Sequence, residues 1–121
     1  MFHDASVSCF AIHGDELCIE TEEFGLSFTE TVPPARITIA GLRCVYRNDV
    51  KVAGFKIESD DAEIYGLDTL PDGFRLHLVW HSWKPRAPEV WCVYWFPGAT
   101  LRTEALSGGP LVLVQELSTQ N

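Results

Sequence analysis

The segment LHLVWHSWKPRAPEVWCVYWF, residues 76–96, holds all four tryptophans of the chain and decides its fold. Apolar and polar residues alternate through its first part, and this period of two is typical of a half-buried β-strand. The run VWCVYWF at 90–96 is apolar throughout, which predicts a second strand covered on both faces. The connection SWKPRAPE contains two prolines, so we predict a hairpin with a stiff, projecting end. The residues expected to form core on the first strand are Phe74, Leu76, Leu78 and Trp80.

The rest of the chain repeats the pattern in shorter runs. Alternation at 6–12 and 16–21, with Gly14 in the turn between them, predicts a first hairpin. Turn sequences such as Pro33-Pro34 and Asn48-Asp49 separate the later runs. We therefore predict a single all-β domain over 1–121, an antiparallel sandwich or partly open barrel of about eight to ten short strands with little helix. The further strands are expected at 24–31, 36–40, 52–58, 63–70 and 110–117.

Acidic residues outnumber basic ones, 17 to 9, and give a net charge of -8. This charge repels phosphate backbones and anionic lipid, so neither nucleic acid nor a membrane is expected as a partner. Residues 1–35 contain no lysine or arginine, and a second acidic block covers 49–72. These carboxylates either keep solvated faces soluble or form a docking surface for a basic protein partner. The candidate docking residues are Glu16, Glu20, Glu22, Glu23, Asp60 and Asp61.

The aromatic hairpin at 74–96 also has two interpretations. Its rings could fill the core of a small sandwich, because each can bury on the order of 150 to 250 Å². Alternatively, some rings line an open platform that anchors a protein partner or stacks against a sugar or another small molecule. A strand that is apolar on both faces could also be covered by a second copy of the chain in a homodimer. The candidate residues of this platform are His77, His81, Trp83, Arg86, Trp91, Tyr94 and Trp95.

The four cysteines lack CxxC spacing, and most of them lie in apolar runs. We expect reduced, buried thiols in a cytoplasmic protein, since the N-terminus has no signal-peptide pattern and the longest apolar run is far too short to span a membrane.

A metal-assisted hydrolase is the third hypothesis. His77 and His81 lie roughly 13 Å apart along a strand, so both cannot bind one metal ion. A zinc site would need His3, Asp4 or a carboxylate to converge with just one of them. No Ser, Cys or Thr nucleophile has an identifiable base beside it in the sequence. We therefore expect a non-enzymatic protein without a metal or other cofactor.

The opening FHDASVSCFAIHGDELCIETE, residues 2–22, combines the motif Phe2-His3-Asp4-Ala5 with an alternating hairpin. It resembles the start of a family of small bacterial β domains that includes the immunity proteins of polymorphic toxin systems. The resemblance implies a protein that binds and blocks a cognate toxin, and an acidic surface would suit a basic nuclease toxin. It gives Asp4 a structural role, accepting backbone hydrogen bonds near the first strand.

Overall fold

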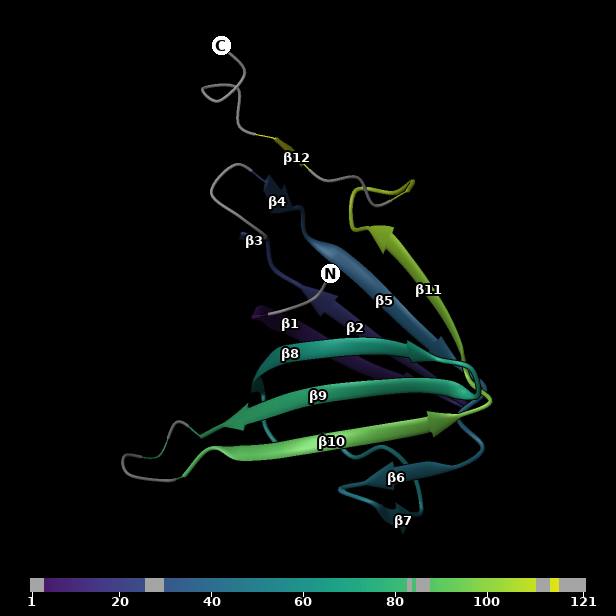
Figure 1. Ribbon diagram of the computed structural model, residues 1–121. Coiled ribbons are helices and arrows are strands. Elements are labelled where there is room, and N and C mark those ends of the chain that lie inside the picture. Colours follow the sequence, from purple (N-terminus) through teal and green to yellow (C-terminus); the bar gives the residue numbers. More distant parts are fainter. Residues whose placement is uncertain (1–3, 26–29, 83, 85–87, 111–113, 116–121) are drawn as a thin grey trace.

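The computed structural model describes residues 4–25, 30–82, 84, 88–110 and 114–115, and these residues form an all-β fold (Figure 1). The predicted fold class is confirmed, since the described residues contain twelve strands and no helix. The strand number exceeds the prediction because several strands are only two or three residues long. The strands are β1 (Ala5–His13), β2 (Glu16–Thr21), β3 (Phe24–Gly25), β4 (Glu30–Val32), β5 (Ala35–Ala40), β6 (Val45–Arg47), β7 (Val50–Val52), β8 (Asp61–Leu70), β9 (Gly73–His81), β10 (Val90–Pro97), β11 (Thr100–Ala105) and β12 (Val114–Gln115).

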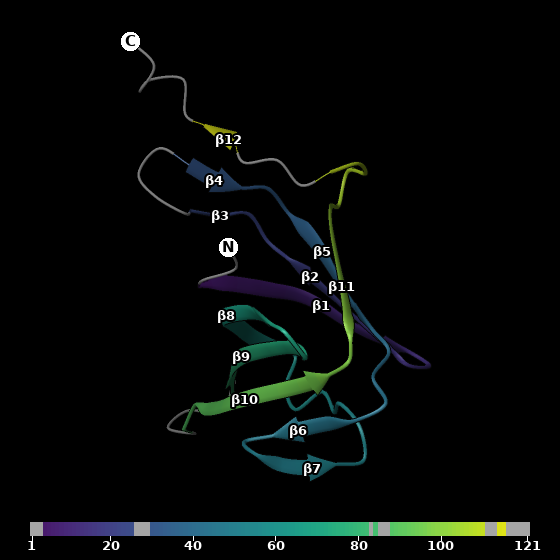
Figure 2. The ribbon, with the colours of Figure 1, turned by 45° about the vertical axis from the view of Figure 1, so that its right-hand side comes forward.

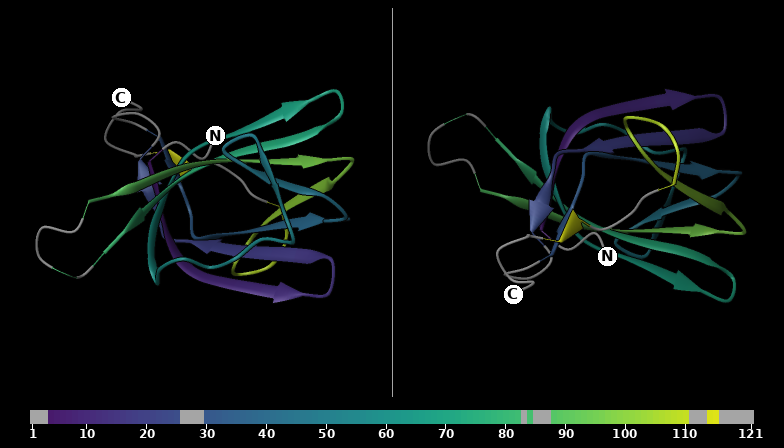
Figure 3. Two further views of the ribbon diagram at one scale, coloured as in Figure 1. Left: turned by 90° about the horizontal axis from the view of Figure 1, so that it is seen from below. Right: turned by 90° about the horizontal axis from the view of Figure 1, so that it is seen from above.

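One large antiparallel sheet contains nine of the described strands, in the order β11-β5-β2-β1-β8-β9-β10-β6-β7. The other three described strands form a small sheet in the order β12-β4-β3. The large sheet bends sharply between β1 and β8, so that its two halves face each other (Figures 2 and 3). Its edge strands β11 and β7 do not pair with each other among the described residues, so the sheet stays open rather than closing into a barrel.

The core lies between the two halves of the bent sheet. Leu17 and Ile19 of β2 and Ile37 and Ile39 of β5 are fully buried in one cluster with residues of β8, β9 and β10. The predicted core face of β9 is confirmed, because Leu76, Leu78 and Trp80 are buried and Phe74 packs against them. A helix capable of crossing a membrane does not occur among the described residues.

A bulge in β1 changes the side on which its residues lie. Val7 pairs with Thr21 but Cys9 pairs with Glu20, so Ser8 is an extra residue in the strand. Such an insertion reverses the alternation along the rest of the strand. As a result Phe10 packs on the core and Cys9 is exposed. The prediction that the cysteines are buried is therefore wrong for Cys9; Cys92 is buried, and Cys18 and Cys44 are half-buried.

The predicted strand at 52–58 is also wrong. Strand β7 ends at Val52, and the chain from 53 to 60 is irregular until β8 begins. This segment places the Phe55 ring against the core, with ring centroids 4.9 Å from Tyr94 and 6.1 Å from Trp80. The segment is anchored by burial of the Phe55 ring and not by pairing with another strand.

Candidate functional site

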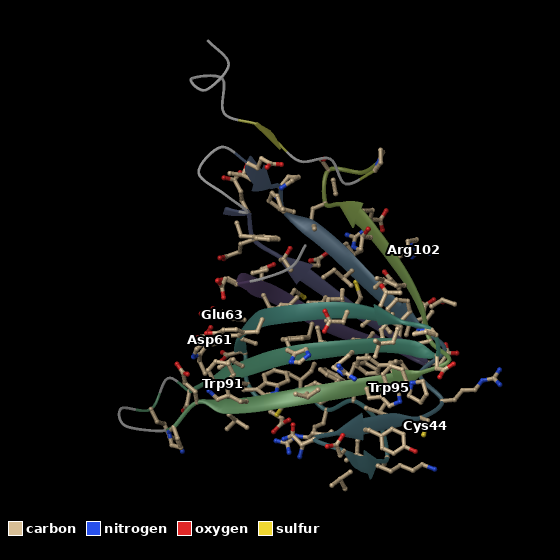
Figure 4. The ribbon with its side chains drawn as sticks, viewed as in Figure 1. Cys44, Asp61, Glu63, Trp91, Trp95 and Arg102 are labelled. Carbon is tan, nitrogen blue, oxygen red and sulfur yellow. The ribbon has the colours of Figure 1, made fainter. Side chains whose placement is uncertain are left out.

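The outer face of β8, β9 and β10 carries an exposed aromatic stripe (Figure 4). Along β10, Cys92, Tyr94 and Phe96 point into the core, so the alternate residues Trp91, Val93 and Trp95 occupy the outer face. Trp91 is 56% exposed and Val93 37% exposed. The described residues of the chain therefore leave the outer face of this strand partly uncovered, and cover by a second copy, a partner or a ligand stays a prediction.

Trp91 forms a pair with Tyr65 of β8. The rings lie with centroids 4.5 Å apart and planes tilted by 49°. Tyr65 is the extra residue of a bulge in β8, because Ile64 pairs with Leu78 while Gly66 pairs with His77. Since β8 and β10 flank β9, the two rings meet across β9, where Val79 is only 1% exposed despite facing outward. The pair thus covers Val79 and fixes the position of the Trp91 ring.

Carboxylates surround this aromatic pair. Glu63 lies in register with Val79, which in turn lies in register with Trp91. His81 sits between two acidic residues, with Nε2 3.3 Å from Glu63 Oε1 and Nδ1 3.4 Å from Glu89 Oε1. The Nε2 atom makes no hydrogen bond within the described residues. Figure 4 shows Asp61 and Glu63 at the end of the sheet that holds Trp91.

The carboxylates around the aromatic pair affect the pKa of Tyr65. Burial, together with the negative charges of Glu63, Asp4 and Glu89, raises the pKa of the Tyr65 hydroxyl above its ordinary value. Carboxylates from β8, from the start of the chain and from the residue before β10 therefore act on one ring. We call Asp61, Glu63, Tyr65, Glu89 and Trp91 the acidic aromatic face.

The end of the stripe that holds Trp95 carries both acidic and basic residues. Trp95 pairs with Arg75 of β9 and with Tyr46 of β6. A groove of about 470 Å³ lies there, lined in part by these three residues and by Asp49. His77, between the two ends, has Nε2 3.4 Å from Asp68 Oδ2. The face therefore runs from an acidic aromatic end to a mixed-charge groove.

The predicted acidic docking residues do not form one continuous surface. The backbone N–H of Glu22 donates to the Ser6 carbonyl, and Ser6 pairs with Glu63, so Glu22 lies near the acidic aromatic face. Glu16 begins β2 and so lies at the opposite end of this strand from Glu22. Glu20 is bound to Arg36 at 3.0 Å, so its charge is already compensated. The remaining members of the predicted set are exposed: Glu23 beside Glu22, and Asp60 and Asp61 at the start of β8.

Tyr94 does not belong to the platform predicted for it. It is 1% exposed and points into the molecule, because β10 turns its even-numbered residues inward. Its hydroxyl donates to Glu58 Oε2 at 2.7 Å and accepts from Trp80 Nε1 at 2.9 Å. Glu58 also accepts two hydrogen bonds from Arg47, each 2.9 Å long. Of the other predicted site residues, His3, Trp83 and Arg86 lie outside the described residues.

Glu58 is the charged centre of this network, which joins the half-exposed Arg47 to the buried Tyr94. Burial raises the pKa of its carboxyl, but the hydrogen bonds from Arg47 and Tyr94 outweigh that effect and leave the pKa below its ordinary value. A carboxyl whose pKa is lower in the folded than in the unfolded chain stabilises the fold above the unfolded pKa. That stabilisation is lost as the pH falls through the folded pKa.

Replacement of Glu58 by glutamine should test this network. We expect Glu58→Gln to lower the free energy of unfolding at pH 7 by about 1–3 kcal/mol, because it removes the charged acceptor of three hydrogen bonds. The difference from wild type should shrink on acidification. Urea unfolding at stepwise lower pH measures both effects. Glu104→Gln, which weakens only the exposed pair with Arg36, is the control and should cost less than about 1 kcal/mol. Equal losses in both variants, or a difference that grows in acid, would contradict this assignment.

The described side chains of the site offer exposed aromatic and carboxylate groups. The described residues contain no group of three or more His, Cys, Asp or Glu side chains placed to hold a metal ion. No family model, curated protein or solved structure matches the chain. Sequence reasoning missed Glu63, Tyr65 and Glu89, although Glu63 and Tyr65 occupy alternate positions of a run expected to be a strand.

Proposed function

We propose that this protein is a non-enzymatic binding protein that holds a basic protein partner through its acidic aromatic face. The observation that carries the proposal is the Trp91 ring, 56% exposed, fixed against Tyr65 and bordered by the carboxylates of Glu63 and Glu89. An arginine or lysine side chain is attracted to the face of an indole ring and to carboxylates beside it. Tryptophan is also among the residues that most often anchor protein interfaces.

The overall charge supports the same class of partner. A net charge of -8 attracts a basic protein over distance and repels nucleic acid. Complementary charge mainly accelerates encounter and rejects wrong partners, while a central aromatic anchor slows dissociation. The resemblance of residues 2–22 to immunity proteins would make the partner a basic toxin, and we propose an immunity or accessory role on that basis.

The proposal can be tested by recovering the tagged protein from its own host and weighing the complexes by native mass spectrometry. We expect a stoichiometric partner of basic composition. A homodimer without a partner, a bound sugar, or an acidic partner would contradict the proposal.

The charge component has its own test once the partner is purified. The double variant Glu63→Gln/Glu89→Gln should slow association about tenfold at low salt and reduce its dependence on salt. Glu16→Gln/Glu104→Gln removes the same number of charges elsewhere on the sheet and should slow association much less. Equal association rates in the two double variants would show that net charge alone, and not this face, attracts the partner.

A further inference from the structure

A second cavity lies on the opposite side of β10 from the acidic aromatic face. It has a volume of about 540 Å³ and is bounded by β6, the end of β7 and the irregular segment after it. Small-molecule sites commonly have volumes of about 300–1,000 Å³ and mostly apolar linings with a few polar groups. The lining residues used below are Arg47, Val52, Phe55, Lys56, Glu58 and Tyr94.

Hydrogen bonds among Arg47, Glu58 and Tyr94 hold the polar wall of this cavity in place. Arg47 binds both carboxylate oxygens of Glu58, and Tyr94 donates to the same carboxylate. The Phe55 ring rests on the Tyr94 ring with centroids 4.9 Å apart. Groups that are already ordered lose little conformational freedom when a ligand binds. Arg47, Glu58, Tyr94 and Phe55 are therefore preorganised parts of the lining.

The charge of the cavity is opposite in sign to that of the protein. Arg47 and Lys56 bring two positive charges to the lining, against the one carboxylate of Glu58, which binds Arg47 and also interacts with the charge of Lys56. The lining therefore has one positive charge in excess beside the apolar side chains of Val52 and Phe55, although the net charge of the chain is -8. A ligand that satisfies both features carries a single negative charge on a flat apolar body.

We infer that this cavity binds a small organic anion of that kind, such as an aromatic carboxylate. The carboxylate pairs with Lys56, and the hydrocarbon body lies against Val52 and the edge of Phe55. Glu58 and Arg47 remain paired with each other and shape the wall. The site lies apart from the acidic aromatic face, so it neither requires nor excludes the proposed protein partner.

The inference can be tested with benzoate and its uncharged analogue benzyl alcohol in two-dimensional ¹H–¹⁵N NMR titrations. We expect benzoate to shift the amide signals of Phe55, Lys56 and Glu58, and to bind about tenfold more tightly than benzyl alcohol, because only benzoate carries a negative charge that pairs with the Lys56 ammonium group. Lys56→Gln should abolish that difference. Because the Lys56 side chain is exposed, this change should leave folding unaffected, and an unchanged spectrum of the free variant would verify this.

Lys51→Gln is the matched control. Lys51 is exposed on the adjacent strand β7 but does not line the cavity. It should leave benzoate binding within about twofold of wild type, since a distant exposed charge is screened by salt. The inference is overturned if benzoate shifts none of these signals, if benzyl alcohol binds equally well, or if Lys51→Gln weakens binding as much as Lys56→Gln.

Discussion

The Gly73→Ala variant is expected to lose about 3 kcal/mol or more of its free energy of unfolding, or to fail to fold. Gly73 begins β9 with φ +154°, a conformation that L side chains rarely adopt. A Cβ atom there would overlap the Phe96 carbonyl oxygen and lie 3.0 Å from Pro97 Cα. These are backbone atoms of the paired strand β10, so they cannot rotate away. The substitution must separate β9 from β10 at one end of the aromatic hairpin.

Two other glycines make this prediction specific. Gly14 also has positive φ, +61°, but a Cβ there would meet no atom within 4 Å, so Gly14→Ala should cost about 1–2 kcal/mol. A Cβ on Gly54 likewise has open space, and its φ lies outside the strained range, so Gly54→Ala should change stability by less than about 1 kcal/mol. Urea unfolding of the three variants gives the ranking. A loss at Gly73 no larger than at Gly14 would contradict the close approach of β9 and β10.

Phe55→Ala should be comparably destabilising, by about 3–5 kcal/mol, although Phe55 lies outside any strand. The ring is 8% exposed and contacts four aromatic rings, those of Phe10, Trp80, Tyr94 and Phe96. Its removal leaves a cavity among rigid side chains that cannot collapse to fill it. Thermal or urea unfolding measures the loss directly.

Ile57→Ala is the control within the same segment. Ile57 is 42% exposed, so its truncation should cost less than about 1 kcal/mol. If Phe55→Ala and Ile57→Ala have equally small effects, the segment from 53 to 60 is a peripheral loop and not part of the core.

The parts of the fold that depend on local alternation were predictable from the sequence. Strand β2 occupies the expected residues 16–21, and the apolar side of β9 forms core, because one side of each is polar. The run at 90–96 was ambiguous for the opposite reason. It is apolar at every position, so only the position of β10 in the bent sheet determines that Tyr94 points inward and Trp91 outward.

The remaining errors come from interactions between distant segments. The bulge at Ser8, which places Cys9 outside, depends on how β1 pairs with β2 and β8. The contact of Tyr65 with Trp91 requires β9 to lie between their strands, and it depends on the register of two pairings, β8 with β9 and β9 with β10. The alternation of Phe55 and Ile57 with Lys56 and Glu58 predicts a strand, whereas the burial of Phe55 depends on rings far away in sequence.

The most direct test of the proposed binding role is to capture partners from the host with wild-type, Trp91→Ala and Ile12→Ala proteins under identical conditions. Trp91 and Ile12 are both exposed apolar residues, but Ile12 lies near the turn between β1 and β2, away from the acidic aromatic face. We expect wild type and Ile12→Ala to retain a stoichiometric basic protein, and Trp91→Ala to bind it about 100-fold more weakly. Retention of that partner by Trp91→Ala at wild-type affinity would contradict the account.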